Sequence, residues 1–223
     1  MIQSILAEIE NDIRKYSPYP EKVRLVVVSK YVDSKIMIDA FNSGVKIFGE
    51  NKAQILKNKK ESFDLKDIKN VSWHFIGNLQ SNKVKYIIDY VDLIHSVNKL
   101  SLAEEINRQA GIKGRTINIL LEVNISGEES KEGYILENLK NDIEDLQKLK
   151  NINIIGLMTM APLTDNENII RDTFRNLKNL QDTLNKDMFN KQLKELSMGM
   201  TNDYKIALEE GATLIRIGSK IFK

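Results

Sequence analysis

A single lysine closes the most apolar stretch of the chain, VRLVVVSK at residues 23–30. A continuous β-branched run of this kind is typical of a strand that is buried on both faces, as parallel sheets require. At the end of such a strand, Lys30 is expected to lie beside buried surface, where partial desolvation lowers the pKa of an ammonium group. The neutral amine would then be a nucleophile toward aldehydes. The alternative is a lysine that extends its charged end into solvent and takes part in no chemistry.

Two stretches near the C-terminus combine glycine with hydroxyl side chains, a pattern typical of phosphate sites. In the first, Ser197-Met198-Gly199 ends an apolar run, Gly199 allows close backbone approach, and Thr201 is placed to cap the next helix. The second is Gly218-Ser219. In barrels of parallel strands, the loops after the seventh and eighth strands commonly bind phosphate through backbone N–H groups. An ordinary turn with a helix cap would explain either stretch taken alone.

Arg216 interrupts the apolar run TLIRIGS near the end of the chain. A guanidinium group stays charged and carries five N–H donors, so in a buried run it needs a partner. That partner is either a neighbouring carboxylate, in a purely structural ion pair, or a bound ligand. An amine, a phosphate site and a fixed cation facing one cavity indicate an aldehyde that carries a phosphate. Pyridoxal 5'-phosphate (PLP) fits this description, and so does the substrate of an aldolase that uses a lysine amine.

The two histidines, His74 and His95, carry a weaker signal. His74 lies among aromatic residues in WHFIG, and His95 ends an apolar run in LIHSV. The chain has no cysteine, no His-Glu-x-x-His motif and no group of carboxylates near either histidine, so the pair does not predict a metal site. We expect both to be hydrogen-bonded residues inside the fold.

These residues need a scaffold that brings distant strand ends to one face. Apolar runs with strand character alternate with segments of helical periodicity along the whole chain, with roughly eight of each. This rhythm predicts an α/β fold, a single (β/α)8 TIM barrel domain over residues 1–223, with a doubly wound open sheet as the competitor. The predicted strands are 25–29, 45–48, 71–76, 93–96, 116–123, 152–158, 193–198 and 213–217.

The helical segments supply two further expectations about the barrel. An extra amphipathic helix before Ser17 is predicted to cover the gap between the last strand and the first, since no final helix is expected after residue 217. Helices are also predicted over 81–90 and 132–149, and the basic run at 57–60 is predicted to be a solvated helix face.

The composition is that of an ordinary globular chain, with 42% hydrophobic residues, 29% charged residues and a net charge of +2. A net charge this small gives no strong electrostatic attraction to nucleic acid or to an anionic membrane. No apolar run approaches the roughly 20 residues that span a bilayer, and the N-terminal segment does not have the pattern of a signal peptide. We therefore expect a cytoplasmic monomer with neither nucleic acid nor membrane as a partner.

Several segments, in order along the chain, resemble the PLP homeostasis protein family, whose barrel is related to the N-terminal domain of alanine racemase. They are VVVSK, FGEN, WHFIGNLQSNK, IHSVN, EVNIS with ESKEG, GLMTM, LSMGMTND and RIGSKIF, between Val26 and Phe222. The resemblance implies a fold-type III PLP barrel with the cofactor bound covalently, as an imine on Lys30. The other residues that it implies for the cofactor site are Asn51, His74, Ser197, Met198, Gly199, Arg216, Gly218 and Ser219.

Within this resemblance, the phosphate would lie around Ser197 and at Gly218-Ser219, and Arg216 would face the pyridine nitrogen. Asn51 would lie near the ring, and His74 would line the same cavity. The chain departs from the family at Tyr31-Val32-Asp33, where Thr-Lys-Pro is usual, and at Asn78, where His is usual. The family's Ser and Thr at positions 201 and 219 are exchanged for Thr and Ser, which keeps both hydroxyl groups.

The arginine separates two classes of function. A cation against the pyridine nitrogen disfavours protonation of the ring, because adjacent positive charges repel. Such a ring is a weaker electron sink, and most PLP enzymes depend on that sink. We therefore predict a PLP-binding protein that takes part in intracellular PLP homeostasis without strong catalytic activity, with apo forms of PLP-dependent enzymes as candidate partners. The alternative is a PLP-dependent enzyme of the amino-acid racemase type, which would use Lys30 and a second base. Racemases with this barrel take that second base from a second domain, and we do not expect such a domain here.

Overall fold

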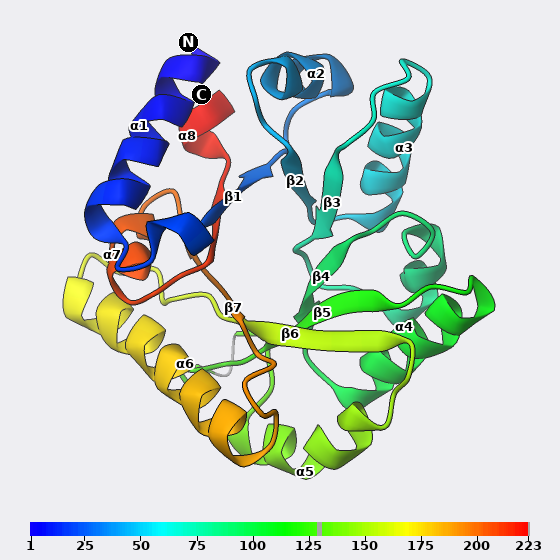
Figure 1. The fold of residues 1–223 in the computed structure, drawn as a ribbon, viewed down its shortest axis with the longest axis vertical. Helices are drawn as coiled ribbons and strands as arrows, with labels where there is room; N and C mark the ends of the chain where they lie inside the picture. Colours follow the sequence, from blue (N-terminus) through cyan, green and yellow to red (C-terminus); the bar gives the residue numbers. More distant parts are fainter. Residues whose placement is uncertain (129–130, 223) are drawn as a thin grey trace.

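A computed structural model describes residues 1–128 and 131–222. Eight parallel strands form a closed barrel in sequence order, and helices surround the ring of strands (Figure 1). The ring closes where β8 pairs with β1, with Arg24 opposite Leu214 and Val27 opposite Ile217. The predicted (β/α)8 barrel is confirmed, and the open-sheet alternative is wrong.

The strands lie close to the predicted ranges. β6 has the predicted bounds. β7 begins two residues late, because the side chain of Asn185 binds the backbone N–H and C=O of Leu193, and it ends two residues late, where Met200 still pairs with Arg216 of β8. The strands are β1 (Arg24–Val28), β2 (Ile47–Glu50), β3 (Ser72–Phe75), β4 (Leu93–Val97), β5 (Ile117–Glu122), β6 (Ile152–Met158), β7 (Glu195–Met200) and β8 (Leu214–Ile217).

Two of the predicted helices are shorter in the structure. The segment at 81–90 is 3-10 helix only as far as Tyr86. The segment at 132–149 becomes helical only at Leu136, because Tyr134 first pairs with Val123 and donates its N–H to the carbonyl of Glu122 at 2.7 Å. The helices are α1 (Ile2–Tyr16), η1 (Pro20–Lys22), α2 (Ser34–Asn42), α3 (Ala53–Asp64), η2 (Ser81–Tyr86), α4 (Leu100–Ile112), α5 (Leu136–Gln147), α6 (Glu167–Asp187), α7 (Tyr204–Glu209) and α8 (Ser219–Phe222).

The extra helix α1 lies beside α7 and α8, next to the seam where β8 meets β1 (Figure 1). It buries Ile9 and Ile13, and the hydroxyl of Tyr204 in α7 donates to Asp12. One expectation is wrong, because a helix does follow β8. This helix, α8, is a single turn of four residues, so α1 supplies the cover that it cannot.

The interior of the barrel changes from apolar to polar along the strands. Val26, Leu93, Leu120, Met158 and Leu214 form a buried cluster inside the ring. Two residues further along β4, β5 and β8, on the same face of each strand, the interior positions hold a histidine, a glutamate and an arginine. These three are His95, Glu122 and Arg216, and each is at most 4% exposed.

Within the part of the chain that is described, every helix is too short or too polar to span a membrane.

Candidate functional site

A cavity of about 550 Å³ opens at the C-terminal ends of the strands, where β1 and β8 meet. Lys30, Arg216, Gly218 and Ser219 line it, together with the segments that follow β6 and β7. Its volume lies in the range of small-molecule sites, and its place on the barrel is where TIM barrels carry their active sites. The structure thus brings four of the predicted site residues to one cavity.

Lys30 lies in the turn directly after β1, with its side chain exposed. Its Nζ is 4.9 Å from the centroid of the Tyr31 ring. The expected partial desolvation of this lysine is therefore wrong. The turn itself is well fixed, because the N–H of Ser29 donates to the carbonyl of Gly49 and the carbonyl of Ser29 accepts from the N–H of Val32, each at 3.1 Å. Lys30 is distinguished by its position and not by burial.

Arg216 reaches the floor of the cavity from β8 and is 4% exposed. Its guanidinium donates to Oγ of Ser197 at 2.5 Å and to the carbonyl of Thr159 at 3.0 Å. Burial lowers its pKa to about 10, so it is still charged at neutral pH. Among the described residues, no carboxylate forms an ion pair with it. The purely structural ion pair considered from the sequence is therefore not formed among them, although the carboxylates of Asp203 and Glu122 lie close enough to raise the pKa of Arg216.

A chain of hydrogen bonds continues from Arg216 through the floor. Oγ of Ser197 lies 2.8 Å from Nδ1 of His95, and Nε2 of His95 lies 3.0 Å from Nδ1 of His74. Since the serine oxygen accepts from Arg216, its own proton is directed to His95, and Nε2 of His95 then donates to His74. Burial lowers the pKa of His74 to about 3 and that of His95 well below its ordinary value, so both rings are neutral. The prediction of two hydrogen-bonded histidines inside the fold is confirmed.

The predicted phosphate loops after β7 and β8 meet at the rim of the cavity. Oγ of Ser219 donates to Oγ1 of Thr201 at 3.0 Å. Gly218 is required where it stands, because a Cβ there would lie 2.7 Å from the carbonyl oxygen of Val28. Thr201 does not cap α7, contrary to expectation. Asp203 takes the N-cap position, and its carboxylate accepts from the N–H of Met200 at 2.5 Å.

The remaining predicted residues lie outside the lining of this cavity. Ser197 and His74 lie in the hydrogen-bonded floor, and Met198 packs in the hydrophobic core. Gly199 has a φ of 88°, and a Cβ there would lie 2.5 Å from that of Ala207, so it allows α7 to pack against β7. Asn51 borders a separate cavity of about 250 Å³. For these five residues, contact with a cofactor stays a prediction.

The segment ESKEG is described in part, since Glu129 and Ser130 lie outside the described residues. Within its described part, the carboxylate of Glu132 accepts from Nδ2 of Asn78 at 2.9 Å and from Nδ2 of Asn98 at 3.1 Å. These bonds tie together the loops that follow β3, β4 and β5. Asn78, where the family usually has histidine, thus has a defined partner.

Two groups near the site were missed from the sequence. Glu122 is 4% exposed, and burial raises its pKa to about 7 although Arg216 lowers it. Lys59 was expected on a solvated face and is instead 6% exposed, bonded to the carboxylate of Glu50. The signal for Lys59 was present, because Leu56, Lys59 and Phe63 recur at helical spacing and share the buried face of α3.

Comparison with known proteins places this geometry in a family. The profile described as "Alanine racemase, N-terminal domain" matches residues 50–223. A curated relative from Aquifex aeolicus (strain VF5), named "Pyridoxal phosphate homeostasis protein", is 39% identical over 221 residues, covering 99% of this chain and 95% of the relative. A protein of the same name from Synechocystis sp. (strain ATCC 27184 / PCC 6803 / Kazusa) is 38% identical and covers 91% of this chain and 92% of the relative.

Solved structures agree with the sequence comparison. PipY of Synechococcus elongatus PCC7942, solved with PLP bound, superimposes with a TM-score of 0.90 at 32% identity and covers 100% of both chains. An alanine racemase from Clostridium difficile 630 has a TM-score of 0.74 at 15% identity, and 54% of its chain is covered. At that identity the racemase shares the fold alone. The near-complete coverage by relatives above 30% identity shows that this chain belongs to the pyridoxal phosphate homeostasis protein family.

Proposed function

We propose that this chain binds PLP in the cavity at the C-terminal end of the barrel and takes part in PLP homeostasis. The observation that carries the proposal is that a single cavity is lined by Lys30, Arg216 and the Gly218-Ser219 loop. These supply an amine, a buried cation that forms no ion pair among the described residues, and a close-packed glycine beside a hydroxyl. The names of the relatives and the PLP-bound neighbour support the same conclusion.

The residues present fit such a ligand. PLP supplies an aldehyde, which the amine of Lys30 would bind covalently as an imine. The hydroxyls of Thr201 and Ser219 and the backbone at Gly218 would hold the phosphate, and Arg216 would face the ring nitrogen. The remaining predicted contacts, Asn51, His74, Ser197, Met198 and Gly199, belong to this proposal in the places described above.

The floor of the cavity favours binding over turnover. Ser197 and the carbonyl of Thr159 hold the guanidinium of Arg216 in place, and neutral His95 and His74 extend behind it. The fixed positive charge opposes proton uptake by a ring nitrogen beside it, which weakens carbanion chemistry. We therefore propose a protein that carries the cofactor, and not an enzyme of the racemase type.

Replacing Lys30 with alanine tests the proposal. The wild-type protein mixed with PLP should show a visible absorption band that borohydride removes, and Lys30→Ala should lose that band. Lys35→Ala, which removes a neighbouring exposed lysine, is the matched control and should retain it. A band that survives Lys30→Ala unchanged would contradict covalent attachment at this residue. Release of the α-proton of amino acids into deuterated water by the loaded protein would contradict a carrier and favour the racemase-type alternative.

We further infer that the chain acts as a single-domain monomer in the cytoplasm and gives up PLP to apo forms of PLP-dependent enzymes. A role in homeostasis supports the transfer of PLP, because a protein that controls the free cofactor must release it to the enzymes that use it. Reactivation of an apo-enzyme by the loaded protein, compared with free PLP at equal concentration, tests the transfer. Sedimentation of the purified chain tests the oligomeric state, and cell fractionation tests the location.

A further inference from the structure

A buried ion pair lies directly behind the turn that carries Lys30. Nζ of Lys59 in α3 donates to Oε1 of Glu50 at 2.5 Å and to the carbonyl oxygen of Ser29 at 2.7 Å. Oγ of Ser29 donates to the same carboxylate oxygen at 2.7 Å. Ser29 and Glu50 are fully buried, and Lys59 is 6% exposed. We call Lys59 and Glu50 the buried pair.

The free energy of desolvation makes the buried pair a poor source of stability by itself. Both charges lose their hydration, and Oε2 of Glu50 has no hydrogen-bond partner among the described residues. Two apolar side chains of similar volume often give equal or greater stability than a buried ion pair. The location of the pair, against the peptide group that leads into Lys30, indicates a role in placing that residue.

Ser29 connects the buried pair to Lys30. Its carbonyl belongs to the planar peptide group shared with Lys30, so the direction of that carbonyl sets the direction in which Lys30 leaves the strand. The same oxygen accepts from the N–H of Val32 and closes the turn that contains Lys30 and Tyr31. Lys59 thus fixes the carbonyl of this peptide group, while β2 fixes the preceding peptide group, in which the N–H of Ser29 donates to Gly49.

We propose that Lys59 and Glu50 are positioning residues that aim the amine of Lys30 at the cavity. The proposal rests on the proposed function, since it takes Lys30 as the residue that binds the cofactor. The side chain of Lys30 is exposed, with its Nζ over the ring of Tyr31, so its placement depends on the backbone. Within the buried pair, Glu50 holds the ammonium group of Lys59, and Lys59 holds the carbonyl.

The test replaces the whole pair, in Glu50→Met/Lys59→Met, so that no buried charge is left without a partner. Lys60→Met is the matched control, because Lys60 is the next residue of the same helix and its ion pair with Asp64 is partly exposed. The first measurement needs no cofactor and follows the amide hydrogen exchange of Val32. The second follows the fraction of Lys30 trapped by borohydride as the concentration of PLP is raised.

We expect the double variant to exchange the Val32 amide at least about tenfold faster than the wild type, which corresponds to 1.4 kcal/mol of local opening. The exchange of Ile215, in β8, should be unchanged. The PLP concentration needed to trap half of Lys30 should rise at least about tenfold, by the same conversion. Lys60→Met should match the wild type in both measurements.

Two results would overturn the proposal. One is a double variant that matches Lys60→Met in both measurements. The other is faster exchange at Val32 with no change in trapping, which would show that the turn is held but that its order does not aim Lys30. If the double variant does not fold, amide exchange in the wild type still tests the proposal. A Val32 amide that exchanges as fast as the Tyr31 amide would show that the turn after Ser29 is not held by its hydrogen bond. Failure of the proposed function is seen separately, as a wild type that shows no PLP band.

Discussion

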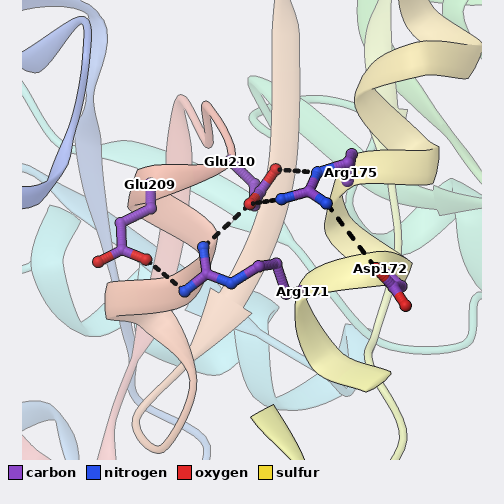
Figure 2. A network of polar contacts seen from close by, with 5 residues as sticks. All are labelled: Arg171, Asp172, Arg175, Glu209 and Glu210. Carbon is purple, nitrogen blue, oxygen red and sulfur yellow. Dashed lines mark hydrogen bonds and ion pairs between the residues drawn. The ribbon is translucent and has the colours of Figure 1, made fainter. Parts of the chain in front are cut away.

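The buried pair behind Lys30 and the ion pairs between α6 and α7 both join a cation to a glutamate, but in opposite surroundings. On the outside of the barrel, Arg171 and Arg175 of α6 bind Glu209 and Glu210 at the end of α7 (Figure 2). The nitrogen–oxygen distances are 2.6 Å for Arg171 to Glu209, and 3.0 Å and 2.9 Å from Arg171 and Arg175 to Glu210. We call these four residues the surface network.

The buried pair and the surface network differ in how far water can reach their charged groups. In the surface network the exposed fraction of the side chains runs from 12% for Glu210 to 52% for Arg175, so water reaches every member and can replace a lost partner. Exposed ion pairs of this kind contribute little to stability. In the buried pair, removal of one residue leaves a buried charge without its counter-charge. Ion pairs within hydrogen-bonding distance thus differ in their contribution to stability according to how deeply they are buried.

The largest effect should come from breaking the buried pair on one side. Lys59→Met leaves the carboxylate of Glu50 buried without a counter-charge, with the hydroxyl of Ser29 still donating to it, so we expect the free energy of unfolding to fall by about 3–5 kcal/mol. Urea denaturation measures this loss. Glu50→Met/Lys59→Met should recover most of it, because no unpaired charge then remains. A single variant that costs less than the surface double variant described below would show that burial does not separate the two groups.

Acid extends the comparison to the buried floor of the cavity. The unfolded-state pKa of a histidine is 6.5, and burial lowers the folded-state pKa of His74 to about 3 and that of His95 well below 6.5. As the pH falls from 6.5 to 4.5, the unfolded chain therefore binds from about one to about two more histidine protons than the folded chain, and stability falls. Glu122 acts in the opposite sense, because burial raises its pKa from 4.5 to about 7 and the folded chain binds its proton first.

The net difference for these three groups is about one proton, or about 1.4 kcal/mol of stability lost per pH unit in that window. Glu122→Gln removes the opposing group and should roughly double the slope. Urea denaturation at several pH values between 6.5 and 4.5 measures both slopes. Equal slopes for the wild type and Glu122→Gln would contradict a raised pKa for this carboxyl group.

The smallest effect should come from the surface network. Arg171→Ala/Arg175→Ala should lower the free energy of unfolding by at most about 1 kcal/mol, since the glutamates regain their hydration. The difference from the wild type should shrink further in high salt, because salt screens exposed charges. Denaturation at low and high ionic strength measures it. A loss above that of Lys59→Met would reverse the comparison.

The barrel could be predicted because buried strands appear in the sequence as continuous apolar runs, and the helices between them appear as apolar residues at helical spacing. The sequence also supported Lys30, Arg216 and the two glycine loops, since charged or flexible residues at strand ends stand out against apolar runs. Lys59 was misassigned because its basic neighbours suggested solvent, and a count of charges does not show which way one side chain of a helix points. The histidine chain and the exposure of Lys30 depend on contacts between strands far apart in sequence, which spacing along the chain cannot supply.

The pairing of β8 with β1 has a consequence for how the cavity comes into being. Lys30 follows the first strand of the barrel and Arg216 lies in the last strand. The ribosome therefore adds Lys30 early in synthesis and Arg216 near its end. A nascent chain still short of its final strand has the amine without the cation or the glycine loop. Under the proposed function, the chain would therefore become able to bind the cofactor only when the barrel closes, and a prematurely terminated chain would not bind it.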